Sequence, residues 1–124
     1  MKLTITVPAP CAWANSNQRL HRMAQANLTK QWREAGFVAA RGLDQLDPPV
    51  RILAHIWKPR RGRYDPMNLW PSVKGAIDGM VSAGLLKDDD HLHVIGPDMR
   101  HGGIGPAAIV FTFEPATPAP SPTD

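Results

Sequence analysis

A group of acidic residues in the second half of the chain has the types and spacing that hard-metal chemistry requires. Asp65 precedes a predicted helix, and Asp88, Asp89 and Asp90 stand in a row just after it. The carboxyl end of a helix already carries partial negative charge, so three carboxylates there repel one another unless a cation compensates them. Mg²⁺ suits such a place because it binds one or two carboxylates and leaves its other positions to water and phosphate oxygens. The alternative interpretation of the acidic run is a solvated turn.

A cluster of cations lies immediately before the first of these aspartates, in the segment KPRRGR. Its charged residues are Lys58, Arg60, Arg61 and Arg63, although the whole chain has a net charge of only +3. Cations grouped in this way attract the phosphates of a nucleic acid whatever its sequence. The alternative is a solvated hairpin. Carboxylates for a metal beside cations for phosphate favour chemistry on phosphodiesters.

The order of these residues resembles a known family. Asp65-Pro66-Met67-Asn68, then Lys74 and Asp78 in KGAID, then AGLLKDDD, is similar to the D-x-D-N, K-x-x-x-D and A-G-x-x-x-D-D series of the RusA family of Holliday-junction resolvases. Near the start of the chain, ITVPAP followed by Asn17 and His21 resembles the first strand and proline-rich loop of that family. The similarity spans residues 3–114.

The resemblance implies a homodimeric endonuclease that uses Mg²⁺, with Mn²⁺ as an alternative, and resolves branched DNA at four-way junctions by paired nicking. Matched by position, it implies catalytic roles for Asp65, Lys74 and Asp89. The candidate metal ligands are Asp65, Asp78, Asp88 and Asp89. The candidate DNA contacts are Lys58, Arg60, Arg61, Arg63, Lys74, Asn17 and Arg19.

One position departs from the family series. Met67 stands two residues after Asp65, where the series has a second aspartate, and a thioether is a poor ligand for Mg²⁺. The amide oxygen of Asn68 is one substitute, and the carboxylates of Asp78, Asp88 or Asp90 are others. The sequence leaves these alternatives open.

Chain geometry constrains which carboxylates can meet. A helix over 71–84 is about 20 Å long, so it separates Asp65 from Asp89. The five residues from Gly84 to Asp89 span at most about 17 Å, so the loop must run back beside the helix for these two carboxylates to converge. Asp78, midway along the helix, is therefore the easier partner for Asp89. Lys74 lies four residues before Asp78, and an ordinary surface ion pair is the alternative interpretation of that spacing.

Hydrophobic periodicity supplies the elements that must position these residues. The predicted order is β-α-β-α-β-β, an α+β fold with a small mixed sheet and two helices. The predicted strands cover 2–7, 50–57, 91–96 and 107–113, and the predicted helices cover 28–41 and 71–84. Residues 8–27 are expected to form an irregular loop and residues 97–106 a turn. Gly36 weakens the first helix, whereas Pro71 and Gly84 suit the two ends of the second.

Length and composition bound the rest. The 124 residues fit one domain, residues 1–114, followed by a proline-rich segment, 115–124, for which we expect disorder. The single cysteine, Cys11, excludes an internal disulfide framework and lacks an activating neighbour, which indicates an inert thiol. The absence of a long apolar run or signal pattern favours a cytoplasmic protein without a membrane segment. Together with the small size, it fits the DNA-recombination role in a bacterial or phage setting that the resemblance implies.

Several residues allow two interpretations. His91 and His93 are predicted on one strand face, where they could bind a transition metal, although polar packing is favoured. Trp13 and Trp70 could stack on unpaired bases, although packing is again favoured. Besides the resolvase, the open hypotheses are a DNA-binding protein that has lost catalysis, which Met67 favours, and an interaction domain without enzymatic activity.

Overall fold

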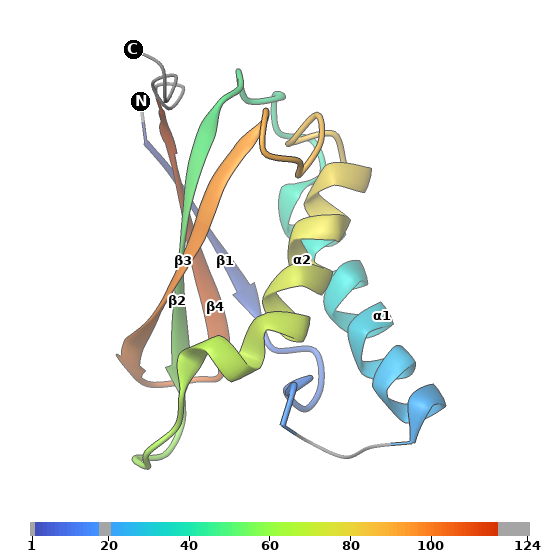
Figure 1. The fold of residues 1–124 in the computed structure, drawn as a ribbon, viewed down its shortest axis with the longest axis vertical. Helices are drawn as coiled ribbons and strands as arrows, with labels where there is room; N and C mark the ends of the chain where they lie inside the picture. The colour runs from blue at the N-terminus through green and yellow to red at the C-terminus, as the bar shows by residue number, and fades with distance from the viewer. Residues whose placement is uncertain (1, 18–20, 117–124) are drawn as a thin grey trace, which may run out of the picture.

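The computed structural model describes residues 2–17 and 21–116. Along the chain it contains strand β1 (Leu3–Pro8), helix α1 (Arg22–Ala40), strand β2 (Val50–Lys58), a short 3₁₀ helix η1 (Pro66–Leu69), helix α2 (Trp70–Ser82), strand β3 (Val94–Ile104) and strand β4 (Ala108–Pro115) (Figure 1). The predicted α+β class and the order β-α-β-α-β-β are therefore confirmed. Arg19 and the residues from 117 onward, where most of the predicted tail falls, lie outside the described residues.

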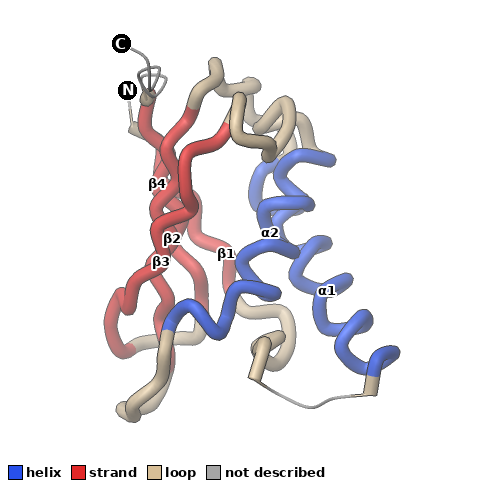
Figure 2. The backbone as a smooth tube through the Cα atoms, viewed as in Figure 1, coloured by secondary structure: helices blue, strands red, loops and turns tan. Residues whose placement is uncertain are grey.

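The four strands form one mixed sheet in the order β1-β4-β2-β3. β4 pairs antiparallel with β1 and with β2, whereas β2 and β3 are parallel. Both helices lie on the same side of this sheet (Figures 1 and 2). Parallel neighbours need a crossover connection, and α2 supplies it between β2 and β3. This connection places residues 58–63 (KPRRGR), the basic segment, before the start of α2. It places the acidic run, residues 88–90, after the end of the helix.

The core lies between the sheet and the helices. Alternate residues of β2 point into it, as the spacing of Ile52, Ala54 and Ile56 predicts, and all three are fully buried. The apolar face of α2, formed by Val73, Ile77 and Met80, is buried in the same cluster. No helix within the described residues is long and apolar enough to cross a membrane.

Glycines allow the two helices to approach each other closely. A Cβ atom added at Gly79 of α2 would lie 1.9 Å from the carbonyl oxygen of Arg33, and one added at Gly36 of α1 would lie 2.1 Å from the carbonyl oxygen of Ala76. Only a residue without a side chain fits at either position. Gly36 therefore serves the packing of α1 against α2, where sequence reasoning treated it as a weakness in the helix.

The predicted start of α1 was wrong by six residues. The helix begins at Arg22, and the imidazole Nδ1 of His21 accepts a hydrogen bond from the backbone N–H of Met23 at 3.2 Å. The residues from Met23 to Ala26 are mostly good helix formers, so the helix continues through Asn27 rather than starting there. The loop before α1 is correspondingly shorter than predicted.

The predicted turn over 97–106 was also wrong, because β3 runs through most of it to Ile104. Residues of this segment pair with β2, with register shifts between Arg51 and Leu53 and between Ile56 and Trp57. The indole of Trp57 covers Gly102 and Gly103, since a Cβ atom at either glycine would lie 2.6 Å from the ring. The glycines that suggested a turn instead make room for a tryptophan.

Candidate metal centre and nucleic-acid interface

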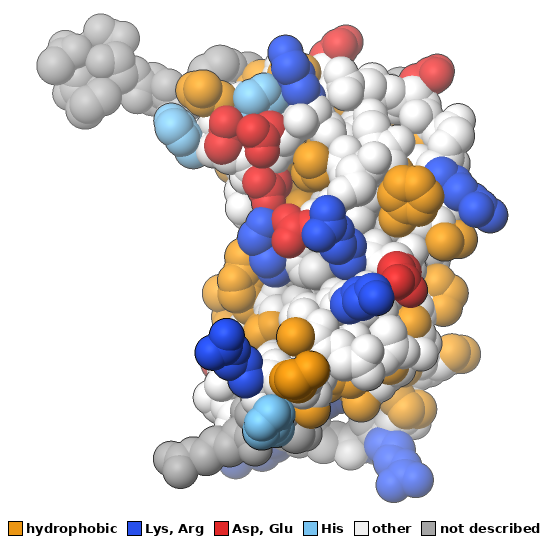
Figure 3. Space-filling view, turned by 90° about the vertical axis from the view of Figure 1, so that its right-hand side faces the viewer, with side chains coloured by type: hydrophobic (Ala, Val, Ile, Leu, Met, Phe, Trp, Pro, Cys, Tyr) orange, Lys and Arg blue, Asp and Glu red, His pale blue; other side chains and the backbone are white. Residues whose placement is uncertain are grey.

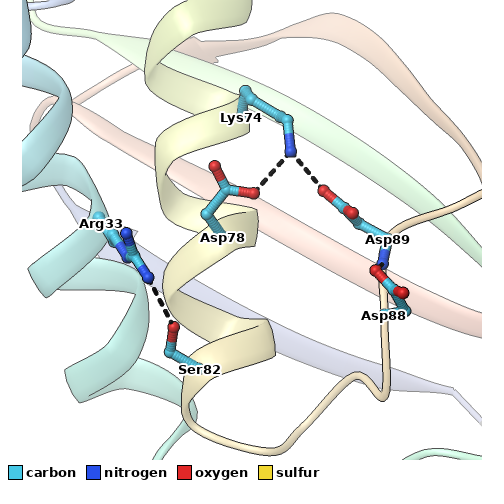
Figure 4. A network of polar contacts seen from close by, with 6 residues as sticks. All are labelled: Arg33, Lys74, Asp78, Ser82, Asp88 and Asp89. Carbon is cyan, nitrogen blue, oxygen red and sulfur yellow. Dashed lines mark hydrogen bonds and ion pairs between the residues drawn. The ribbon is translucent and has the colours of Figure 1, made fainter.

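Three charged side chains converge beside α2. The Lys74 ammonium donates a hydrogen bond to Oδ1 of Asp78 at 2.6 Å and another to Oδ2 of Asp89 (Figure 4). Lys74 and Asp78 are one turn apart on α2, whereas Asp89 comes from the loop after the helix, 15 residues beyond Lys74. The loop therefore returns beside the helix and brings Asp89 to the ammonium that Asp78 also binds, and Asp78 is the partner that chain geometry favoured for Asp89.

The charges in this trio stabilise one another. Burial opposes the charge of Lys74, but the hydrogen bonds to Asp78 and Asp89 outweigh it and raise the pKa of the ammonium. The hydrogen bond from Lys74 lowers the pKa of Asp89 against the opposing effect of burial. The Lys74 side chain is 41% exposed and that of Asp89 28%, so both remain accessible to a ligand from solvent.

Asp65, the first predicted metal ligand, is not part of this charged trio. Its carboxylate accepts a hydrogen bond from the backbone N–H of Met67 at 3.0 Å and so caps η1 before α2 begins. Among the described residues, only Asp88, Asp90 and His93 form a group of three or more such side chains with ligand atoms within 4.8 Å of one another. Asp65 is therefore not brought into a three-ligand group with the other predicted carboxylates.

The Asp88, Asp90 and His93 group is tied to the turn that contains it. Oδ1 of Asp88 accepts a hydrogen bond from the backbone N–H of Asp89, and Oδ1 of Asp90 accepts from the backbone N–H groups of Leu92 and His93. Nδ1 of His93 also contacts Oδ1 of Asp90. These bonds account for the acidic run as a structured turn.

The two histidines predicted on one strand face are not in a strand. His91 and His93 lie in a turn, and β3 begins only at Val94. Hydrogen bonds from His93 and Val94 to the backbone carbonyl of Asp90 form that turn. The three-residue spacing between Asp90 and His93 was the signal for their contact, and sequence reasoning missed it.

The basic segment borders a hollow of about 340 Å³ lined by residues 58–64 and Trp13. Arg60, Arg61 and Arg63 are exposed there. The Lys58 ammonium lies 4.1 Å from the centroid of the Tyr64 ring, a distance at which cation and ring attract each other. Three exposed guanidinium groups around a hollow can bind the backbone of a nucleic acid.

Two tryptophans that allowed two interpretations have different surroundings. Trp13 stacks on buried Trp32 with ring centroids 4.9 Å apart, so packing accounts for it. Trp70 is 41% exposed and lines a second hollow, of about 290 Å³, together with Lys74, Ile77 and Asp89. An aromatic ring thus borders the same hollow as two members of the charged trio.

The remaining predicted residues are peripheral to the trio. Asn17 is exposed, and its backbone N–H donates to the side-chain oxygen of Asn15 at 2.8 Å, which matches loop hydrogen bonding. Burial raises the pKa of the Cys11 thiol, as expected for an unreactive cysteine. On the face of the molecule drawn in Figure 3, several acidic side chains gather in one patch, and basic side chains lie directly beside it.

Comparison with known proteins adds no family to this description. No protein-family profile matches the chain, and no curated protein matches it at a significant level. Function must therefore be inferred from the geometry of the charged trio, the acidic run and the basic segment.

Proposed function

We propose that this protein is a Mg²⁺-dependent endonuclease of the RusA type, which resolves four-way DNA junctions by paired nicking as a homodimer in the cytoplasm of a bacterial or phage-infected cell. The observation that carries the proposal is the convergence of Asp78 and Asp89 on one cation, the Lys74 ammonium. Two partly exposed carboxylates that already share a cation are a suitable donor set for Mg²⁺, which prefers oxygen ligands and often takes only one or two carboxylates.

Three side chains, Asp78, Asp89 and Lys74, would have different roles in phosphodiester hydrolysis. Asp78 and Asp89 would hold the metal, and when bound the metal would orient the attacking water and neutralise charge on the phosphate. Lys74 borders the hollow beside these carboxylates and can donate to a phosphate oxygen as negative charge develops there. The water oxygen bonds to phosphorus as one P–O bond breaks, and a water proton ends on the leaving oxygen.

Substrate binding is assigned to the basic segment. Arg60, Arg61 and Arg63 are exposed next to a hollow, so they can contact the DNA backbone without reading its sequence. Preference for a branched junction over linear duplex would then come from the arrangement of two such surfaces in the dimer.

A second candidate function is DNA binding without cleavage. Met67 is 58% exposed where the family series has a carboxylate, and the Asp65 carboxylate is engaged in capping η1. A chain in this state would keep the basic segment and bind junctions while the metal centre lacks a ligand.

The deciding experiment is a nicking assay on a labelled four-way junction and on linear duplex, with Mg²⁺ or EDTA, for wild type and Asp89→Asn. We expect Mg²⁺-dependent, junction-selective nicking that falls at least about a hundredfold in the variant, as expected when a preorganised charged group is removed. Ser82→Ala, a substitution at an exposed position of α2, is the control, and this variant should nick the junction at the wild-type rate. Junction binding without cutting would favour the second candidate, and absence of both binding and cutting would refute each of them.

A further inference from the structure

We propose that the Lys74 ammonium is an internal counter-cation that occupies the metal position between Asp78 and Asp89, so that a divalent ion binds by displacing it. The inference deepens the proposed function and rests on it, because the ion concerned is the cofactor of the proposed nuclease. It assigns Lys74 a part in metal loading as well as in contact with the phosphate.

The competition follows from the position of the ammonium. Its nitrogen lies 2.6 Å from Oδ1 of Asp78 and also donates to Oδ2 of Asp89. A magnesium ion bound by the same two oxygens would lie about 2.0–2.1 Å from each of them. The ammonium and the ion therefore need the same oxygens and nearly the same space, and their positive charges repel each other.

The two-carboxylate arrangement separates this case from an ordinary ion pair. A lysine paired only with the residue one turn along its helix would leave Asp89 free to bind a metal. Here the second carboxylate comes from a loop 15 residues further along the chain, and the same ammonium connects the two. The lysine thus holds the two carboxylates together while it excludes another cation.

A neighbouring hollow can accommodate the Lys74 ammonium after a metal ion displaces it. Its side chain is 41% exposed and borders the hollow of about 290 Å³ that Trp70 and Ile77 also line. Rotation of its four-carbon stem can carry the ammonium into that hollow without disturbing the core. A phosphate bound beside the metal would lie next to the released ammonium, so metal loading would make Lys74 available to the substrate.

The test uses Mn²⁺ as the probe and needs no DNA. Binding of Mn²⁺ to the purified full chain is followed by electron paramagnetic resonance for wild type, Lys74→Met and Lys87→Met. Methionine keeps a long unbranched side chain and helix propensity but removes the charge. Lys87 is an exposed lysine in the loop that carries Asp89, so its variant has the same loss of charge without removing the bridging ammonium.

We expect Lys74→Met to bind Mn²⁺ about tenfold more tightly than wild type, which corresponds to about 1.4 kcal/mol. Lys87→Met should change the affinity by less than about twofold, because dissolved salt screens the interaction of an exposed charge with the metal. Asp89→Asn introduced into Lys74→Met should remove the gain. An affinity for Lys74→Met equal to or weaker than that of Lys87→Met would overturn the inference, while binding by wild type would leave the proposed metal-dependent function standing.

Acetylation of wild type gives a second test that requires no variant. The rate at which an amine-reactive reagent modifies Lys74 is measured by mass spectrometry with and without Mg²⁺, and Lys87 in the same molecule is the reference. Mg²⁺ should speed the modification of Lys74 relative to Lys87, because the displaced ammonium loses its two acceptors. An unchanged ratio would contradict displacement.

The Mn²⁺-binding and nicking assays can disagree. A gain of Mn²⁺ affinity in Lys74→Met without any junction cleavage by wild type would support the inference and refute the nuclease.

Discussion

Ser72 is a buried polar residue that connects the loop after β1 to α2. It is fully buried near the start of α2, and its hydroxyl accepts a hydrogen bond from the N–H of Ala14 at 2.8 Å and donates one to the carbonyl of the same residue at 3.0 Å. Ala14 is itself fully buried, so the hydroxyl pairs both backbone groups of a residue that water does not reach. This side chain thus connects Ala14, in the loop that follows β1, to α2.

Replacement Ser72→Ala should therefore destabilise the protein by about 1–3 kcal/mol, because both polar groups of Ala14 lose their partner. In thermal unfolding, a loss of about 1 kcal/mol corresponds to a fall in Tm of about 4 °C for a domain of this size. Ser82→Ala removes a hydroxyl that accepts one exposed hydrogen bond from Arg33, and it should leave Tm nearly unchanged. Equal Tm values for the two variants would show that the buried pair contributes nothing.

At the scale of elements, the decisive contact is that between α1 and α2. The helices approach so closely that backbone of one lies where a side chain of the other would be, at Gly36 and again at Gly79. Lys74 and Asp78 are on α2, and Asp89 follows it, so the position of this helix determines where the charged trio forms. The close approach at the two glycines thus supports the candidate site at a distance.

Gly79→Ala tests this packing. Alanine in a helix is worth about 1 kcal/mol more than glycine, so local propensity alone predicts a more stable protein. The added Cβ would instead meet Arg33 O at 1.9 Å and Phe37 N at 2.7 Å, backbone atoms that cannot rotate away. We expect a net loss of about 1–3 kcal/mol from overpacking, measured by denaturant unfolding. Gly62→Ala, in a loop and with no atom within 4 Å of its added Cβ, is the control for adding a methyl group without a clash, and a stabilised Gly79→Ala would refute the close approach.

At the scale of the whole molecule, opposite charges stand at opposite ends of α2. The chain enters the helix from the basic segment and leaves it toward the acidic run, and the crossover between the parallel strands β2 and β3 requires this direction. The separation keeps the cations that would bind DNA from neutralising the carboxylates that would bind a metal. Lys74, on α2 between the two ends, is the cation that reaches the carboxylates.

Changing Arg60, Arg61 and Arg63 together to Gln should weaken junction binding in EDTA and reduce its dependence on salt. The slope of log K against log salt concentration should become shallower by about 0.9 for each phosphate that the variant no longer neutralises. A control that changes Arg22, Lys30 and Arg41, three exposed cations on or next to α1, to Gln removes the same charge elsewhere. Filter binding at several salt concentrations measures the affinity and its salt dependence for each triple variant. Equal slopes for the two triple variants would show that the basic segment does not bind the DNA.

The sequence by itself determined the elements whose patterns are strong and local. Alternation in β2 predicted its position and its buried side, because each residue's direction follows from backbone geometry. The period of apolar residues predicted α2, but not what its apolar face packs against. The one-turn spacing of Lys74 and Asp78 also indicated an ion pair, which was the alternative interpretation, and the structure contains that pair.

Tertiary structure decided what depends on distant partners. β3 continues through Gly102 and Gly103 because β2 supplies backbone partners and Trp57 fills the space above them. Asp89 joins Lys74 and Asp78 because the loop after α2 returns along the helix, a path that chain length permits but does not impose. The carboxylate of Asp65, a predicted metal ligand, instead caps η1. Local patterns set which face an element buries, whereas only packing brings carboxylates from different segments to the same cation.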